Sequence, residues 1–313
     1  MSTTLRLASF NVENLFARWR FKDGVNPADA NTRGWIVDQT HFVELGQDDK
    51  AITGAALQAI DADVLALQEV ENVDTLKHFR DRYLGGRAKY PYIAGVDGND
   101  PRLIDVAVLS KLPITHIRSY QHFLEPSSPT TPLFSRDCLE VDVEVGVGAS
   151  KSTLTLYVNH FKSMIGGRSQ TRPKREQQAA KVMEIVTERF GSSPGGSPFV
   201  VLGDLNDYMQ TDADGSPGIS ALVDWDQVEN VVARLPVDDQ WTHFFASGNE
   251  YRQLDYILPS ASLASATAAV PEIFRQGVPL RAVKYTGPRL PGVGLDNPKA
   301  SDHCPVVLQL EIP

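Results

Sequence analysis

The chain consists of many short apolar segments of strand length, and most of them end in a strongly polar residue. Apolar runs such as residues 199–202 are far shorter than the ~20 residues that a membrane-spanning helix needs. Apolar or alternating patterns predict strands at residues 5–10, 64–67, 92–95, 105–110, 117–123, 139–145, 154–159, 199–202, 251–258 and 305–310. Such strands are stable only when sheets pack on one another or beneath helices.

Three segments have the apolar spacing of helices, at residues 49–60, 74–83 and 173–190. In the last of them, Pro173 suits the first turn and Gly191 suits the position after the end. Residues 17–47 form a long insertion that we expect to be irregular. Many strands and few helices, without strict alternation, predict two sheets packed face to face with helices outside.

We expect a single domain over residues 1–313, because this length is near the upper limit for one hydrophobic core. A composition of 42% hydrophobic and 22% charged residues excludes disordered, coiled-coil and collagen-like chains. No basic region followed by an apolar stretch opens the sequence. We therefore expect a cytoplasmic protein, or a secreted or periplasmic one whose signal peptide has been removed. Two cysteines, Cys138 and Cys304, fit a reducing compartment, with a single disulfide bridge between them as the alternative.

Strongly polar side chains lie at the ends of the predicted strands. They are Asn11, Glu69, His160, Asp204, Asn206, Asp255, Asp302 and His303. Burying such groups is costly unless they are paired or bind a cation, so we expect them to meet at one edge. The remaining histidines (His41, His78, His116, His122 and His243) are expected to be structural.

The segment around Asp204 is the most informative of these strand ends. Asp204 and Asn206 are separated by one residue, so in an extended segment both side chains point to one face. A carboxylate and an amide side by side suit a water molecule and a phosphoryl oxygen. Near the end of the chain, Asp302 suits a metal, while Asp255 suits the orientation of an imidazole.

The available ligand atoms favour Mg²⁺ or Mn²⁺, because Glu, Asp and Asn supply oxygen. Zinc is not expected, since the sequence has no C-x-x-C and no H-E-x-x-H. There is also no phosphate-binding glycine loop of the Walker or G-x-G-x-x-G type. The adjacent residues Ser301, Asp302 and His303 do not form a hydrolase triad, which requires convergence from separate segments.

The charge distribution is uneven along an acidic chain. A protein that binds polyanions passively is normally basic, whereas this chain has a net charge of −9. Bound cations nevertheless allow an acidic protein to act on phosphates. A stretch without acids follows His160 and carries the basic residues Lys162, Arg168, Arg172, Lys174 and Arg175. It is interpreted either as a mobile phosphate-steering rim or as an ordinary solvated loop. In the first case Lys162, Arg168 and Arg172 contact the substrate.

Six segments together resemble the endonuclease/exonuclease/phosphatase superfamily, and they occur in the family's order over nearly the whole chain. They are residues 9–16, 67–70, 159–163, 203–207, 254–257 and 301–305. The opening N-V-E-N-L-F and the N-H-F-K-S are most similar to a bacterial nuclease-like branch. The resemblance implies an α+β fold, a four-layer αββα sandwich of two mixed, mainly antiparallel sheets. It also implies a divalent-metal-dependent phosphoric ester hydrolase.

The resemblance also implies a role for each matching residue. Metal binding is expected for Glu69, Asn11 and Asp302. Catalysis is expected for Asp204, which orients or deprotonates the attacking water, for Asn206, which holds a phosphoryl oxygen, and for His160, His303 and Asp255. His160 and His303 stabilise the phosphate or shuttle a proton, and Asp255 orients His303. An acid that orients His160 is not evident, with Asp105 and Glu140 as the two options considered.

The substrate that follows from these expectations is DNA or RNA, cleaved by in-line attack of water. A lipid headgroup or an inositol phosphate is the alternative within enzymes. A catalytically inactive binding module on the same scaffold is a further alternative, which the retention of every acid, amide and imidazole argues against. The protein is expected to act as a monomer.

Overall fold

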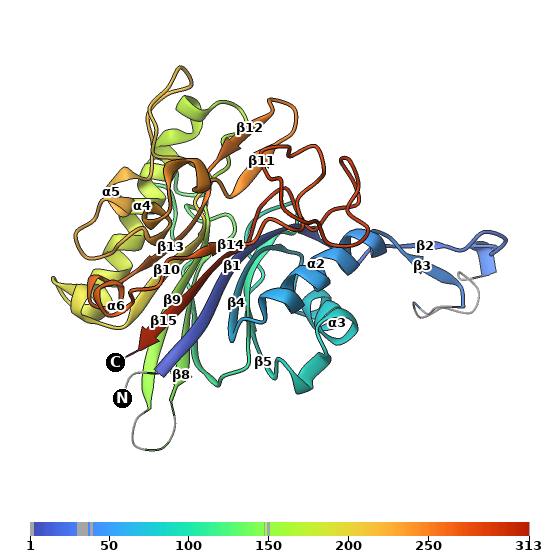
Figure 1. Cartoon of the computed structure of the whole chain (residues 1–313), viewed down its shortest axis with the longest axis horizontal. Coiled ribbons are helices and arrows are strands. Elements are labelled where there is room, and N and C mark those ends of the chain that lie inside the picture. The colour runs from blue at the N-terminus through green and yellow to red at the C-terminus, as the bar shows by residue number, and fades with distance from the viewer. Residues whose placement is uncertain (1–2, 30–36, 38–39, 147, 149–150, 313) are drawn as a thin grey trace.

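Two sheets pack face to face between outer helices in the computed structural model, which describes residues 3–29, 37, 40–146, 148 and 151–312 (Figure 1). The first sheet has the order β14 (Glu272–Ile273), β15 (Val306–Ile312), β1 (Thr3–Leu15), β4 (Val64–Val70), β6 (Asp105–Ser110), β5 (Tyr92–Gly95). The second has the order β13 (Asp255–Pro259), β10 (Phe199–Asp204), β9 (Ser152–His160), β8 (Cys138–Val145), β7 (Ile114–Ser119). The predicted four-layer α+β sandwich is confirmed.

Each sheet contains one parallel pair among antiparallel neighbours. β1 runs parallel to β4, and β9 runs parallel to β10. Parallel strands end at the same edge of a sheet, so the polar residues that follow these four strands are brought to one end of the sandwich. Side chains such as Leu7, Val106, Leu156 and Leu202 fill the core between the sheets.

The helices cover the outer faces of the two sheets (Figure 1). α2 (Gln47–Ile60) and α3 (Val73–Tyr83) pack on the six-stranded sheet through residues such as Leu57 and Phe79. α4 (Arg168–Phe190) packs on the five-stranded sheet through Val182 and Val186. The shorter helical elements are η1 (Gly86–Ala88), η3 (Pro194–Gly196), α5 (Ser220–Val223), η4 (Val231–Arg234), η5 (Val237–Asp239) and α6 (Ala261–Ala266). No helix within the described ranges is both long and apolar enough to cross a membrane.

Three sequence predictions differ from the structure. The predicted strand at residues 251–258 is two strands, β12 (Glu250–Arg252) and β13, because β12 pairs with β11 (His243–Phe245) while β13 joins β10. β7 ends at Ser119 rather than at residue 123, since the next backbone N–H donates to the Asp137 carboxylate. α4 begins at Arg168 rather than at Pro173, which lies inside the helix.

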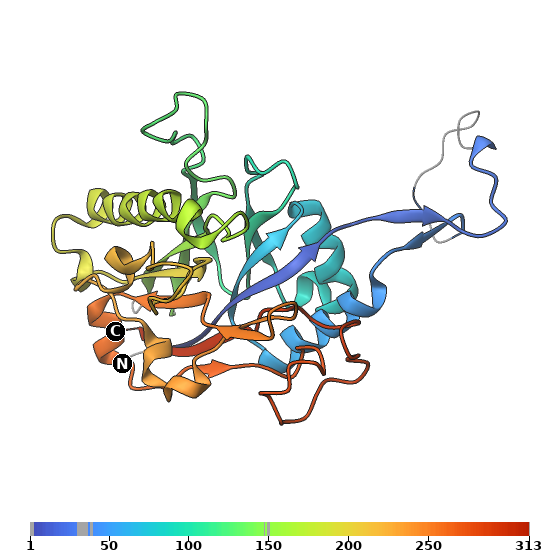
Figure 2. The same ribbon diagram turned by 90° about the horizontal axis from the view of Figure 1, so that it is seen from above.

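The insertion at residues 17–47 is not wholly irregular. β2 (Trp19–Phe21) and β3 (Phe42–Glu44) pair as a narrow arm that projects from the body, where the rings of Phe21 and Phe42 lie 4.7 Å apart (Figure 2). Residues 30–36 and 38–39 of the insertion lie outside the described residues. β1 precedes the arm and α2 follows it. The arm therefore connects a strand of the six-stranded sheet to a helix that covers this sheet.

Gly203 allows the second sheet to close next to the polar strand ends. It pairs with Asn159 of β9 and Tyr256 of β13, and it has φ +132°, which favours glycine. A Cβ at this position would lie 1.9 Å from the Asn159 carbonyl oxygen. Only glycine therefore fits between the two neighbouring strands.

We predict that Gly203→Ala lowers the free energy of unfolding by at least about 2 kcal/mol, through backbone strain and loss of strand pairing. Urea unfolding monitored by circular dichroism measures the change. Gly196→Ala is the control, because its Cβ would meet nothing within 4 Å. Equal stability of the two variants would contradict this account of Gly203.

Candidate active site

The polar strand ends gather around one cavity of about 490 Å³. Residues from both sheets and from the β11–β12 hairpin line it, among them Glu69, His160, Asp204, Asn206, Asp302 and His303. Asn11 donates a hydrogen bond to Asp204, and Asp255 contacts His303, so both adjoin the residues that line the cavity. The structure thus brings together all eight residues that were expected to bind metal or act in catalysis.

Asp204 is at the centre of the site. Its side chain is 1% exposed and accepts hydrogen bonds from the Asn11 and Asn206 amides at 3.0 Å and from the Asn206 backbone N–H at 2.8 Å. Burial raises the pKa of Asp204 to about 7, and the nearby Asp255 adds to this rise while His303 opposes it. A carboxyl group with such a pKa is suited to exchange a proton near neutral pH.

The expected extended geometry of Asn206 is wrong. Asn206 has φ +52°, in the left-handed region, so its side chain turns back toward Asp204 instead of lying parallel to it. The same amide also donates to the Phe161 carbonyl oxygen at 3.2 Å. Asn206 nevertheless lines the cavity, so a tight turn brings the amide to the place that an extended segment was expected to provide.

Glu69 comes from the end of β4, where the backbone also adopts a left-handed conformation, with φ +64°. One carboxylate oxygen accepts from the Asn14 backbone N–H at 3.0 Å. The other lies 3.9 Å from Nε2 of His160. The side chain is 15% exposed, so the carboxylate is held in place and still faces the cavity.

The two expected catalytic histidines have opposite electrostatic environments. Burial lowers the pKa of His160 well below its ordinary value, and Arg136 acts in the same direction. Burial opposes protonation of His303 as well, but Asp255 and Asp204 outweigh it and raise its pKa well above the ordinary value. His160 is therefore the neutral imidazole and His303 the cationic one.

His303 is oriented as expected. Its Nδ1 lies 2.9 Å from the Asp255 carboxylate, which also accepts a 2.7 Å hydrogen bond from the Thr242 hydroxyl. Its Nε2 lies 3.8 Å from Asp204 and faces the cavity. For His160, neither Asp105 nor Glu140 is the orienting acid, because Asp105 accepts from Gly98 and Glu140 binds Tyr120 and Arg189. The Nδ1 atom of His160 has no hydrogen-bond partner in the described part of the chain.

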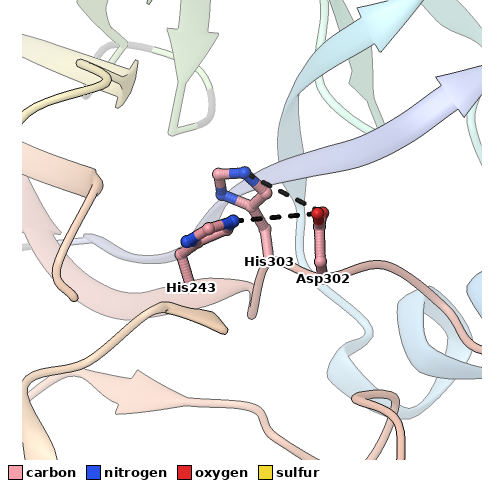
Figure 3. Close-up of side chains that lie close together, drawn as sticks. All are labelled: His243, Asp302 and His303. Carbon is pink, nitrogen blue, oxygen red and sulfur yellow. Dashed lines mark ion pairs between the residues drawn. The ribbon is translucent and has the colours of Figure 1, made fainter. Parts of the chain in front are cut away.

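His243 was expected to be structural, but it lines the cavity beside Asp302 and His303 (Figure 3). Its Nε2 lies 3.7 Å from the Asp302 carboxylate, and its ring centroid lies 4.5 Å from that of His303. Burial opposes ionisation of Asp302, but His243 and His303 lower its pKa below the usual range. A single histidine in a short strand has no sequence signal that separates it from a structural one.

The donor set fits a divalent cation. Each arginine that lines the cavity is paired with a carboxylate outside the expected metal ligands: Arg102 with Asp100, Arg168 with Asp207, and Arg252 with Glu250. Among the described residues, Glu69, Asp204 and Asp302 therefore face imidazoles rather than these cations. Two groups place their possible ligand atoms within 4.8 Å of one another, His243–Asp302–His303 and Asp204–Asp255–His303. Carboxylate oxygens with imidazoles nearby are groups that bind divalent cations in proteins.

The basic stretch after His160 differs from the expected mobile rim. Arg168 lines the cavity, but its guanidinium donates to Asp207 at 2.8 Å and to several backbone carbonyls. Arg172 contacts Glu176 and the Ser216 hydroxyl, and neither Arg172 nor Lys162 is among the described residues that line the cavity. These contacts favour a structural role for Arg168 and Arg172 over the expected contact with substrate.

Asp207 connects the turn that carries Asp204 to α4. It is fully buried and accepts hydrogen bonds from Nε of both Arg168 and Arg175 and from the Gly218 backbone N–H, each at 2.8 Å. The Arg175 side chain is itself fully buried. This ion network explains why α4 begins at Arg168, and it holds the turn on which Asp204 and Asn206 depend.

The fold and the site together define a metal-dependent phosphoric ester hydrolase. The sequence matches the model of the Endonuclease/Exonuclease/phosphatase family over residues 8–303, and the chain belongs to this family. Members of the family are divalent-metal-dependent hydrolases that act on nucleic acids or other phosphoesters. No curated protein matches the sequence.

Solved structures with the same fold have low sequence identity to this chain. An endonuclease/exonuclease/phosphatase family protein from Bacteroides thetaiotaomicron is 17% identical, with a TM-score of 0.62, over 100% of this chain and 99% of that one. The human Nocturnin catalytic domain with bound sulfate is 14% identical, with a TM-score of 0.59, over 99% and 95%. Truncated Caenorhabditis elegans TDP2 is 17% identical, with a TM-score of 0.55, over 99% and 98%. At such identities the likeness shows the shared fold.

We predict that Arg175→Met destabilises the protein by about 3–5 kcal/mol, because it leaves part of the buried Asp207 charge without a partner. Denaturant unfolding measures the loss. Arg172→Met is the matched control on the same helix, since the exposed Arg172–Glu176 pair contributes no more than about 1 kcal/mol. A similar small effect for both variants would refute the structural role of the network.

Proposed function

We propose that this chain hydrolyses phosphodiester bonds of nucleic acids, with Mg²⁺ or alternatively Mn²⁺ as the cofactor. The observation that carries the proposal is the convergence of Glu69, Asp204 and His303 on one cavity. Such hydrolysis needs a polarised water molecule, neutralisation of the phosphoryl oxygens and assistance to the leaving alkoxide. The residues of the cavity provide a group for each of these tasks.

Asp204 is the group that positions and deprotonates water. Its raised pKa of about 7 matches the requirement for a general base near neutral pH. The Asn11 and Asn206 amides hold the carboxylate in one orientation, which leaves the geometry of attack defined before substrate arrives. In this proposal Asn11 orients Asp204, and Asn206 also binds a phosphoryl oxygen.

His303 is the cationic donor of the site. Asp255 holds its Nδ1, so Nε2 faces the cavity and donates a hydrogen bond or a proton to an oxygen of the substrate. His160, which stays neutral, contacts the scissile phosphate from the end of β9. Glu69 and Asp302 would hold the divalent cation, which supplies charge neutralisation at the phosphate and at the leaving oxygen.

A nucleic acid is favoured as substrate by the charges around the cavity. Arg102 and Arg252 line it with side chains that are 50% and 35% exposed, so both can approach phosphates that flank the scissile one. Such contacts release counterions, and the affinity for a polynucleotide then depends on salt. The retained acids and imidazoles oppose the alternative of an inactive binding module.

We predict that Asp204→Asn and His303→Ala each reduce kcat by at least about 100-fold, the range found when one preorganised catalytic group is removed. Steady-state cleavage of a plasmid and of single-stranded DNA and RNA measures the loss, with circular dichroism to verify the fold. Asp224→Asn is the control, because this carboxylate is exposed and lies outside the lining of the cavity. Near-wild-type turnover in either catalytic variant would overturn the assigned roles.

We also predict that EDTA abolishes cleavage and that added Mg²⁺ or Mn²⁺ restores it. Glu69→Gln should raise the cation concentration needed for half-maximal activity, because it removes one ligand charge. The same panel includes sphingomyelin and inositol phosphates, and increasing salt should weaken only the cleavage of nucleic acid. Activity that persists in EDTA would refute the metal role of Glu69. Turnover of sphingomyelin alone would refute nucleic acid as the substrate.

A further inference from the structure

The lining of the catalytic cavity includes exposed apolar side chains as well as the charged groups of the site. Ile165 and Phe245 both line the cavity, and their side chains are 77% and 51% exposed. Ile165 follows His160 in the loop before α4, and Phe245 ends the strand that begins at His243. Large apolar side chains exposed at the mouth of a polar cavity indicate that part of the ligand is apolar.

An aromatic and cationic stack lies next to these two residues. The Tyr208 ring is contacted by the Arg168 guanidinium, with Cζ 3.6 Å from the ring centroid, and by that of Arg252, with Cζ at 4.7 Å. Tyr208 and Arg252 both line the cavity. The stack holds Arg252 against a fixed ring, so its position does not depend on a ligand.

The same wall also carries polar groups that point to a hydrogen-bonding ligand. Glu250 lines the cavity and lies 3.3 Å from Arg252. Nε of Arg252 is buried and has no hydrogen-bond partner in the described part of the chain. A ligand that satisfies this wall therefore needs both an apolar surface and polar atoms at its edge.

We propose that the outer part of the cavity, formed by Ile165, Phe245, Glu250 and Arg252, with Tyr208 buried beneath Arg252, is a binding site for the nucleobase next to the scissile phosphate. This inference rests on the proposed function and specifies its substrate. A base presents flat apolar faces to Phe245 and Ile165 and donor and acceptor atoms to Glu250 and Arg252. An acyl chain would offer no hydrogen-bond donor or acceptor to the Glu250–Arg252 pair and would bury its charges against hydrocarbon.

The test compares two ligands that differ only in the base, a deoxynucleoside 5′-monophosphate and deoxyribose 5′-phosphate, by calorimetric titration of the whole protein with Mg²⁺ present. We expect the nucleotide to bind about 5- to 160-fold more tightly, the range for stacking of one base on an aromatic ring. Phe245→Ala should remove this difference, and Phe245→Tyr should retain it. Val237→Ala is the control, since Val237 is 78% exposed and lies outside the lining of the cavity.

The possible outcomes separate the two proposals, because binding is measured without turnover. Equal affinity of the wild-type protein for both ligands would overturn the base site, even if nucleic acid is cleaved. An equal loss of affinity for both ligands in Phe245→Ala would overturn it as well, since Phe245 would then affect binding of the sugar phosphate rather than of the base. Binding of the wild-type protein, but not of Phe245→Ala, to vesicles of phosphatidylcholine and sphingomyelin would assign the wall to a lipid instead. A preference of the wild-type protein for the nucleotide that Phe245→Ala loses, with cleavage absent from every substrate, would retain the base site and refute the nuclease.

Discussion

The structure depends on one buried carboxylate where the two sheets meet. Asp204 ends β10 in the second sheet, and the Asn11 amide that binds it lies in β1 of the first, 3.0 Å away. Its partners limit the cost of desolvating this charge, but they do not remove it, and the pKa rises accordingly. The interaction that joins the two layers thus holds a carboxyl group whose pKa burial has raised.

The turn after Asp204 serves two opposite sides of the molecule. Asp204 and Asn206 face the cavity, while Asp207 faces α4 and its two buried arginines. A buried ion pair is weak evidence for stability, but it fixes geometry when every acceptor is satisfied. The stiffness of the turn explains how Asn206, which lies beyond the end of β10, is held at a fixed position beside Asp204.

Within this family, the shared fold supplies the phosphate chemistry, and the segments around the cavity distinguish one substrate from another. Here those segments are the loop after β9, the β11–β12 hairpin and the Tyr208 stack. They differ in character from the inner site, since they combine exposed apolar side chains with paired charges. If the outer wall binds a base as proposed, substrate choice depends on residues that perform no step of the chemistry.

The sequence by itself indicated sheets packed face to face beneath helices, because apolar periodicity is a local pattern. The four layers and the roles expected for Glu69, His160, Asp204 and His303 followed from six motifs read together as a family resemblance, because any one of these motifs is weak by itself. Only the tertiary structure decided the left-handed turn at Asn206, the burial of Arg168 and Arg175 against Asp207, and the place of His243 in the cavity. Each of these depends on a partner far along the chain, as Asn11 depends on Asp204 at a separation of 193 residues. Residue spacing alone does not encode which distant group a side chain will meet.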